Sequence, residues 1–228
     1  MKIYPKVSKY DNLSATFFKL SDEEVTPLNE EISLILEKIK DDEKELQKYA
    51  NNIKLAGQIE HQYILNDSVN NHIERILLPA VKHYVNQHTP LTFLTISDRQ
   101  NLDNLTINNV KDNPCWVNLQ KKYEYNPLHR HSGMLSFVIW LKVPYSSENE
   151  KNYSNSIKSL SSKRNSSLNG DFCFIKMNNN IIEQTPLGVD QTWENRGVLF
   201  SSDLFHAVYP FYTSNEYRIS ISGNYFVR

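Results

Sequence analysis

The feature that most constrains this chain is a change in its hydrophobic period near residue 90. Before that point, apolar residues recur at the helical spacing i, i+3, i+4, i+7, as in Ile32, Ile35, Leu36 and Ile39. After it, short runs that are rich in β-branched and aromatic residues are separated by turn residues, which is typical of strands. The sequence therefore predicts a helical N-terminal part followed by a strand-rich part.

Two helices are expected before residue 90. Thr26 and Pro27 suit the N-cap and the first position of one helix. Asp67 suits the N-cap of the other, and Pro79 is expected to kink or split it. Three histidines of this part lack the i, i+4 spacing of a helical metal pair, and we interpret them as solvated or partly buried helix residues: His61, His72 and His83.

Six strand-like runs follow: LTFLTI, PCWVNLQKKYEYN, MLSFVIWLKVP, GDFCFIKM, GVLFSSDLFHAVYPF and YRISISGNYFV. Because no helix intervenes, they predict an all-β sandwich or barrel. Residues 146–170 are rich in Ser, Asn, Lys and Glu without periodicity, and we expect a loop that is disordered or closes over a substrate. The predicted organisation is an N-terminal helical elaboration, residues 1–90, packed on a core of residues 91–228.

Composition narrows the function. A chain of 228 residues suits one domain or a core domain with an elaboration, and a net charge of −1 does not indicate a nucleic-acid or membrane-surface protein. Cys115 and Cys173 are far apart and fit reduced residues in a cytosolic protein. No apolar run approaches ~18 residues and the first residues lack an apolar stretch, so neither a membrane span nor a signal peptide is expected.

The stretch YNPLHRHSG carries two histidines, His129 and His131, one residue apart. On a strand, residues i and i+2 face the same side, and Pro127 favours an extended conformation of Asn126. Two imidazoles side by side are natural metal ligands. Two surface histidines on a loop would give the same pattern, so both interpretations stay open here.

The C-terminal part adds His206 on an aromatic run and a final strand on which polar and apolar residues alternate. Arg218, Ser220 and Ser222 share one face of this strand, and Ile219 and Ile221 share the other. The polar face is either exposed to solvent or directed into a barrel that binds an anion. In the second case, arginine supplies a two-point fork for a carboxylate and serine a further donor.

Together these motifs resemble the 2-oxoglutarate- and Fe(II)-dependent oxygenases, with His-x-(Asp/Glu/His), a distal His and Arg-x-Ser on the next strand. NPLHRHSGMLSFVIWLKVP and LFHAVYPFYTSNEYRISISGN are most similar to a branch related to prolyl hydroxylases, including uncharacterised phage-encoded members. The resemblance covers roughly residues 112–227 and is absent in the Ser/Asn-rich loop. It implies a mainly β fold with N-terminal α-helices, namely a double-stranded β-helix (jelly roll, cupin-like).

The resemblance also implies a site and a reaction. His129, His131 and His206 match the ligands of Fe(II), and Arg218 with Ser220 matches the site for the far carboxylate of the cosubstrate 2-oxoglutarate. The expected reaction is hydroxylation of a C–H bond coupled to oxidative decarboxylation of 2-oxoglutarate to succinate. A peptidyl residue such as proline is the leading substrate.

Further expectations concern neighbours and partners. Tyr125 and Asn126, just before the first histidine, are candidate contacts to the cosubstrate. We expect a protein or peptide substrate and neither nucleic acid nor membrane as a partner. The expected location is the cytoplasm, that of the host if the protein is phage-encoded. The oligomeric state is open, with a dimer as one option.

One residue departs from the family pattern. The usual triad is two histidines and a carboxylate, whereas His131 stands at the carboxylate position. A carboxylate from elsewhere, Asp203 or Glu124, is an alternative ligand. A non-catalytic jelly-roll module that binds a ligand or partner is the second possible function. Three-histidine iron sites occur in cupin-type dioxygenases that do not use 2-oxoglutarate, which gives a third.

Overall fold

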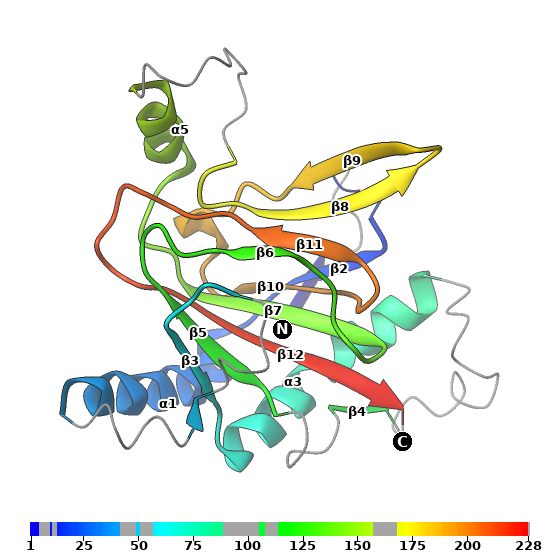
Figure 1. Ribbon diagram of the computed structural model, residues 1–228. Helices are drawn as coiled ribbons and strands as arrows, with labels where there is room; N and C mark the ends of the chain where they lie inside the picture. Colours follow the sequence, from blue (N-terminus) through cyan, green and yellow to red (C-terminus); the bar gives the residue numbers. More distant parts are fainter. Residues whose placement is uncertain are drawn as a thin grey trace.

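The computed structural model describes residues 1–4, 10, 13–41, 49–50, 57–88, 105–107, 114–156 and 168–227. Within them the fold is mainly β, with two antiparallel sheets and three α-helices (Figure 1). The helices are α1 (Asp22–Asp41), α3 (Asp67–Gln87) and α5 (Ser147–Ser156), and a 3-10 turn covers Gln191–Trp193. The expected run LTFLTI lies outside the described residues.

The large sheet has the strand order β1-β2-β10-β7-β12-β5-β3, and β4 also pairs with β12. Its strands are β1 (Lys2–Tyr4), β2 (Ala15–Lys19), β3 (His61–Ile64), β4 (Leu105–Ile107), β5 (Trp116–Gln120), β7 (Leu135–Lys142), β10 (Arg196–Ser201) and β12 (Arg218–Val227). The small sheet has the order β6-β11-β8-β9. Its strands are β6 (Asn126–His129), β8 (Phe172–Asn178), β9 (Ile181–Pro186) and β11 (Phe205–Val208).

Strands β5 to β12 pass back and forth between the two sheets. β5, β7, β10 and β12 lie in the large sheet, β6, β8, β9 and β11 lie in the small sheet, and only the β8–β9 hairpin stays within one sheet. Two four-stranded layers joined in this way have a jelly-roll-like arrangement. The mainly β fold with N-terminal helices is therefore confirmed, and the strand order is consistent with a double-stranded β-helix.

Alternation along the strands produces two apolar clusters. On β7, Phe137 and Ile139 pack with residues of α1 and α3, whereas Val138 and Trp140 pack toward the small sheet with Phe172. Helices α1 and α3 therefore cover one face of the large sheet. The opposite face of that sheet lines the space between the two sheets, where polar side chains from β5 and β12 are placed.

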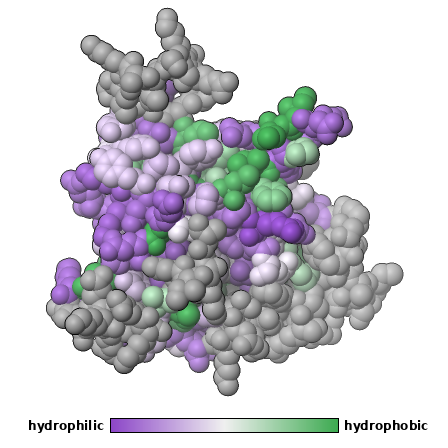
Figure 2. All heavy atoms as spheres, in the orientation of Figure 1, coloured by the Kyte–Doolittle hydropathy of each residue, from purple (hydrophilic) through white to green (hydrophobic). Residues whose placement is uncertain are grey.

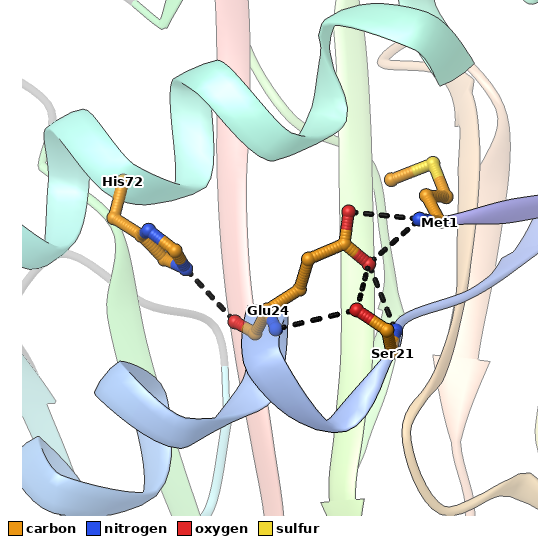
Figure 3. Close-up of polar contacts among 4 residues, drawn as sticks. All are labelled: Met1, Ser21, Glu24 and His72. Atoms are coloured by element: carbon orange, nitrogen blue, oxygen red, sulfur yellow. Dashed lines mark hydrogen bonds and ion pairs between the residues drawn. The ribbon is translucent and has the colours of Figure 1, made fainter.

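The N-terminal part differs from the expectation of helices alone, because β1, β2 and β3 extend the large sheet. Helix α1 also begins earlier than predicted. Ser21 and Glu24 form a capping box, in which the Ser21 backbone N–H donates to Glu24 Oε2 at 2.8 Å (Figure 3). Thr26 is thus inside the helix, and its Oγ1 donates to the Asp22 carbonyl at 2.8 Å. The domain boundary near residue 90 stays a prediction.

Helix α3 corrects two details of the sequence interpretation. Its N-cap is Asn66 rather than Asp67, and Asn66 Oδ1 accepts from the Val69 backbone N–H at 2.9 Å. Pro79 lies inside the helix, which nevertheless continues to Gln87 without being split. None of the described helices is long and apolar enough to span a membrane.

Part of the segment 146–170, which was expected to be a loop, is helical. Helix α5 is held by the buried carboxylate of Glu150, which accepts from the backbone N–H groups of Tyr212 and Thr213 at 2.8–3.1 Å. Tyr153 stacks on Tyr212 with 5.0 Å between ring centroids. Residues 157–167 lie outside the described residues, so the disorder or closure of that stretch stays a prediction.

The β8–β9 hairpin closes through Asn179 and Asn180, both with positive φ, as a two-residue type I′ turn requires. Apolar side chains gather over this hairpin on the face shown in Figure 2. Met177, Ile181 and Ile182 are 75%, 64% and 67% exposed there. The hairpin therefore presents an apolar outer edge of the small sheet.

Candidate metal and anion site

Two paired strands of the small sheet bring the three site histidines together. His129 ends β6 and is the register partner of His206 on β11. His131 lies two residues beyond β6, where its backbone N–H donates to the Ser202 carbonyl at 3.0 Å. The predicted i, i+2 pair and the distal histidine thus reach the same place from one sheet edge.

The three imidazoles are close enough to bind one ion. One nitrogen from each of His129, His131 and His206 lies within 4.8 Å of the others, and the ring centroids are 4.3–5.1 Å apart. Among the described residues this is the one group of three or more histidine, cysteine or acidic side chains with such spacing. The histidines of the N-terminal part are not in it: His61 lies buried on β3 and His72 contacts the Glu24 carbonyl.

Backbone carbonyls fix the orientation of two of these rings. His129 Nδ1 lies 2.6 Å from the Pro127 carbonyl, and His206 Nδ1 lies 2.9 Å from the Leu204 carbonyl. Because a carbonyl oxygen only accepts, each Nδ1 carries the proton and donates. Nε2 then keeps its lone pair, which is the arrangement that outer hydrogen bonds give to metal-binding histidines.

Burial keeps the three imidazoles neutral. It lowers the pKa of His129, and it lowers the pKa of His131 to about 4, with His129 as a second cause. Burial and the two neighbouring histidines place the pKa of His206 well below its usual value. Since only the neutral ring binds a metal, the site is in its ligating form at neutral pH.

Aromatic side chains surround the rings. His206 is stacked on Phe172 at 5.1 Å between centroids and has Phe200 edge-on at 5.0 Å. Trp116 lies 5.8 Å from the His131 ring. These contacts limit rotation of the imidazoles and give the site an apolar wall on one side.

Neither alternative carboxylate joins the histidines. The side chain of Asp203 is 63% exposed and forms an ion pair with Arg130 at 2.8 Å. Glu124 accepts from the backbone N–H groups of Glu60 and Lys121. In the described part of the chain, the group of possible ligands is therefore made of histidines alone.

Arg218 faces the same cavity as the histidines. Ile219 and Ile221 pack in the apolar cluster beneath the helices, whereas Arg218 and Ser220 line the space between the sheets. The guanidinium is 2% exposed and donates to Gln120 Oε1 from Nε and Nη2. Nη1 donates to the Tyr145 hydroxyl at 2.6 Å and to the carbonyl of residue 170 at 2.5 Å.

These partners of Arg218 are all neutral. No carboxylate among the described residues lies within ion-pair distance of it. Burying an uncompensated charge is costly, so buried charges in proteins are normally paired. The buried Asp171 carboxyl acts on Arg218 electrostatically without contacting it directly. An anion in the cavity would supply a directly paired charge, which makes Arg218 a candidate anion-binding residue.

The cavity has a volume of about 130 Å³ and contains most of the predicted site residues. Ser220 lines it, although its hydroxyl accepts from Asn118 Nδ2 at 3.4 Å and does not contact Arg218. Asn126 also lines it. Tyr125 does not, and its carbonyl instead accepts from the Gln58 backbone N–H at 2.8 Å. Their roles toward a cosubstrate stay predictions.

Sequence reasoning missed several lining or supporting residues. Asn118 and Gln120 alternate with buried Val117 and Leu119 on β5, and this period of two was a usable signal for a polar inner face. Tyr145, which contacts Arg218, carried no such signal. Gln62 also lay in a part of the chain that was interpreted as helical.

The segment that carries this site is similar to a known protein family. Residues 114–224 match the model of the family described as "Putative 2OG-Fe(II) oxygenase", and this match covers just under half of the chain. It includes the three histidines and Arg218. The segment that carries the site is therefore similar to the 2OG-Fe(II) oxygenase family. No curated protein matches the sequence.

Two solved structures are similar over nearly the whole chain. A prolyl-4-hydroxylase of Pseudomonas putida is 15% identical, with 96% of each chain covered and a TM-score of 0.49. The structure described for prolyl 4-hydroxylases from Phytophthora capsici is 12% identical, with 96% of this chain and 60% of that chain covered and a TM-score of 0.48. At these sequence identities and TM-scores, the two structures do not indicate the function of this chain. The comparisons do not support a phage origin.

Proposed function

We propose that this protein is a 2-oxoglutarate- and Fe(II)-dependent oxygenase that hydroxylates a C–H bond. The observation that carries the proposal is the shared cavity, where three neutral imidazoles and a buried arginine without a directly paired carboxylate face the same space. A metal beside an anion-binding arginine suits a cosubstrate with two charged ends. The family of the segment 114–224 supports the same reaction class.

The donor set fits an iron ion. His129, His131 and His206 would hold it, since neutral imidazole suits Fe as well as Zn, Cu and Ni. When bound, Fe(II) supplies the oxygen chemistry that couples decarboxylation of 2-oxoglutarate to hydroxylation of the substrate. The protein supplies positioning and a dry pocket.

The residues around the ion would place the cosubstrate. Arg218 would bind the far carboxylate of 2-oxoglutarate, and Gln120 and Tyr145 hold its guanidinium in position. Phe172 and Trp140 line the cavity and would keep water from the reacting centre. A peptidyl residue such as proline is the proposed substrate, supported by the sequence resemblance alone.

Turnover of 2-oxoglutarate tests this function. Wild-type protein with Fe(II) and O₂ should form succinate, and His206→Ala should not. His83→Ala is the matched control, because His83 lies on α3 and outside the group of three histidines. If the wild type forms no succinate while it binds iron, the proposal is wrong.

A second candidate is a three-histidine dioxygenase that does not use 2-oxoglutarate. It is favoured by Arg218, because protein acceptors already engage four of its five N–H groups. A 2-oxoglutarate carboxylate would have to use the remaining N–H or displace one of those partners. Oxygen uptake by the iron-loaded protein that is independent of 2-oxoglutarate would favour this candidate. Absence of iron binding would instead favour a non-catalytic module.

A further inference from the structure

Two buried acceptor atoms in the cavity lack hydrogen bonds. Gln62 Oε1 and Asn126 Oδ1 are shielded from solvent and have no hydrogen-bond partner among the described residues. Both side chains line the cavity that contains the three histidines. Asn126 Oδ1 packs against Gly57, because a Cβ added to that glycine would lie 1.8 Å from this oxygen. Since buried polar atoms are normally satisfied, the Gln62 carbonyl oxygen marks a place where a ligand atom is expected.

A polar row across three strands holds Gln62 in place. Gln62 on β3 is the register partner of Asn118 on β5, and its Nε2 donates to Asn118 Oδ1 at 2.7 Å. Asn118 Nδ2 in turn lies 3.4 Å from the hydroxyl oxygens of Ser220 and Ser222 on β12. Gln62 is 1% exposed. With its amide nitrogen engaged by Asn118, the free oxygen of Gln62 is an acceptor in a fixed position.

The cosubstrate does not satisfy the Gln62 oxygen. At neutral pH, 2-oxoglutarate carries two carboxylates and a ketone, all of which are acceptors. We propose that Gln62 supplies the acceptor of a donor-recognition subsite that binds an N–H or O–H group of a second organic ligand. The subsite itself does not depend on the proposed function. Only the identification of its ligand as the substrate of the oxygenase rests on that function.

The charge of the cavity narrows the ligand class. Its lining includes no Asp or Glu and two arginines, of which Arg130 is paired with Asp203 and Arg218 has no carboxylate at ion-pair distance. A cationic donor such as an amine or a guanidinium would be repelled by Arg218. An amide N–H or a hydroxyl has no such penalty, so the subsite is suited to a neutral donor group. Peptide amides and hydroxylated small molecules share this chemistry.

The subsite also lies partly outside the family segment. Gln62 and Ile59, which both line the cavity, precede the matched residues 114–224. The N-terminal part of the chain therefore contributes directly to the cavity through β3 and the residues just before it. On this proposal, the N-terminal part of the chain helps to determine which substrate is bound, in addition to covering the large sheet.

Matched pairs of small probes test the donor preference. N-methylacetamide and N,N-dimethylacetamide share a carbonyl, but only the first has an N–H. 2-Propanol and acetone form the corresponding hydroxyl pair, so the two arms distinguish amide from hydroxyl ligands. Each probe is titrated into the isotope-labelled 228-residue protein, first without metal and then with Zn(II) and 2-oxoglutarate. The signals of the Gln62 and Asn126 side-chain amides report binding by NMR.

In at least one arm, the donor probe should bind about tenfold more tightly than its donor-free partner, as expected for a single buried hydrogen bond. Gln62→Met, which keeps the length but removes the acceptor, should abolish the preference, and Gln58→Met at an exposed site should retain it. Equal binding within both pairs, a preference for the donor-free probes, or no binding of any probe would overturn the proposal.

The wild-type titrations test the preference for donor probes even if Gln62→Met does not fold. Because binding is read in the metal-free protein as well, failure of the subsite is distinguishable from failure of the oxygenase proposal, which depends on iron and succinate formation.

Discussion

Replacing Arg218 with lysine separates the charge of this residue from its geometry. Lysine keeps the positive charge but loses the planar fork. In the structure the fork donates to Gln120 on one side and to Tyr145 and the carbonyl of residue 170 on the other. A single ammonium group cannot reproduce both sides at once. Arg218→Lys should therefore weaken anion binding without removing the charge that attracts the anion.

The expected magnitude follows from the lost hydrogen bonds. A hydrogen bond to a charged group contributes about 1.5–3 kcal/mol, so losing one from the complex with 2-oxoglutarate lowers its affinity by about one to two decades. The variant should also be less stable, because a buried acceptor at Gln120 or residue 170 loses its donor. Such a loss costs about 1–3 kcal/mol.

The assay is titration with 2-oxoglutarate in the presence of Fe(II) without oxygen, beside a separate measurement of Fe(II) affinity. Arg75→Lys is the matched control, because Arg75 is an exposed residue of α3. Iron affinity should stay nearly unchanged in Arg218→Lys, since the three histidines are untouched. Unchanged affinity for 2-oxoglutarate, or an equal loss of iron affinity, would refute the reasoning.

Four further predictions concern other side chains. His206→Ala should abolish metal binding measured by calorimetry, while His83→Ala binds as the wild type does; retained binding would exclude His206 as a ligand. Ser220→Ala should reduce 2-oxoglutarate affinity by ~1 kcal/mol or less, because its hydroxyl contacts Asn118 rather than Arg218; a loss as large as that of Arg218→Lys would contradict this. Glu150→Gln should lower the free energy of unfolding by about 1.5–3 kcal/mol in denaturant titration, because an amide NH₂ replaces an acceptor of backbone N–H groups; exposed Glu148→Gln should not, and equal stability of the two variants would contradict the anchoring role. Burial raises the pKa of Asp171 from 3.8 to about 6, so the folded state holds this proton more tightly than the unfolded state. The contribution of Asp171 to the free energy of unfolding is therefore present in full below pH 3.8 and falls by about 3 kcal/mol as the pH rises through 6. Asp171→Asn should remove this component of the pH profile of stability. Identical pH profiles of the variant and the wild type would contradict this prediction.

The strand-rich core was predictable because it depends on local alternation. Ile219 and Ile221 pack beneath the helices and Arg218 faces the cavity, as the period of two on the last strand indicates. The pair His129 and His131 was detectable for the same reason, since i, i+2 residues project together from a strand. Here one imidazole ends the strand and the other lies just beyond it.

The missed features depend on contacts between distant parts of the chain. The strand HQYI is short and lies before a helix, and only its pairing with β5 makes Gln62 part of the cavity. The partners of Arg218 come from β5 and from residues beyond β7, so no sequence spacing connects them. Helix α5 is polar throughout and is held by Glu150 and Tyr153 against a remote loop, which its own periodicity could not indicate.

Strand β9 was missed although a local signal was present. The residues Asn179 and Asn180 form a two-residue hairpin turn, and the apolar residues on either side of it continue the strand pattern. The signal was obscured because β9 lies at the edge of the small sheet, where none of its residues is fully buried and no alternation of buried and exposed positions marks it.

The measurement that tests the central claim most directly is anaerobic titration of the wild-type protein with Fe(II) and then with 2-oxoglutarate. If the three histidines hold iron and Arg218 holds the far carboxylate, a visible metal-to-ligand charge-transfer band should appear only when both are present. The band should saturate at one 2-oxoglutarate per chain. Iron-loaded protein that shows neither this band nor any affinity for 2-oxoglutarate would contradict the account.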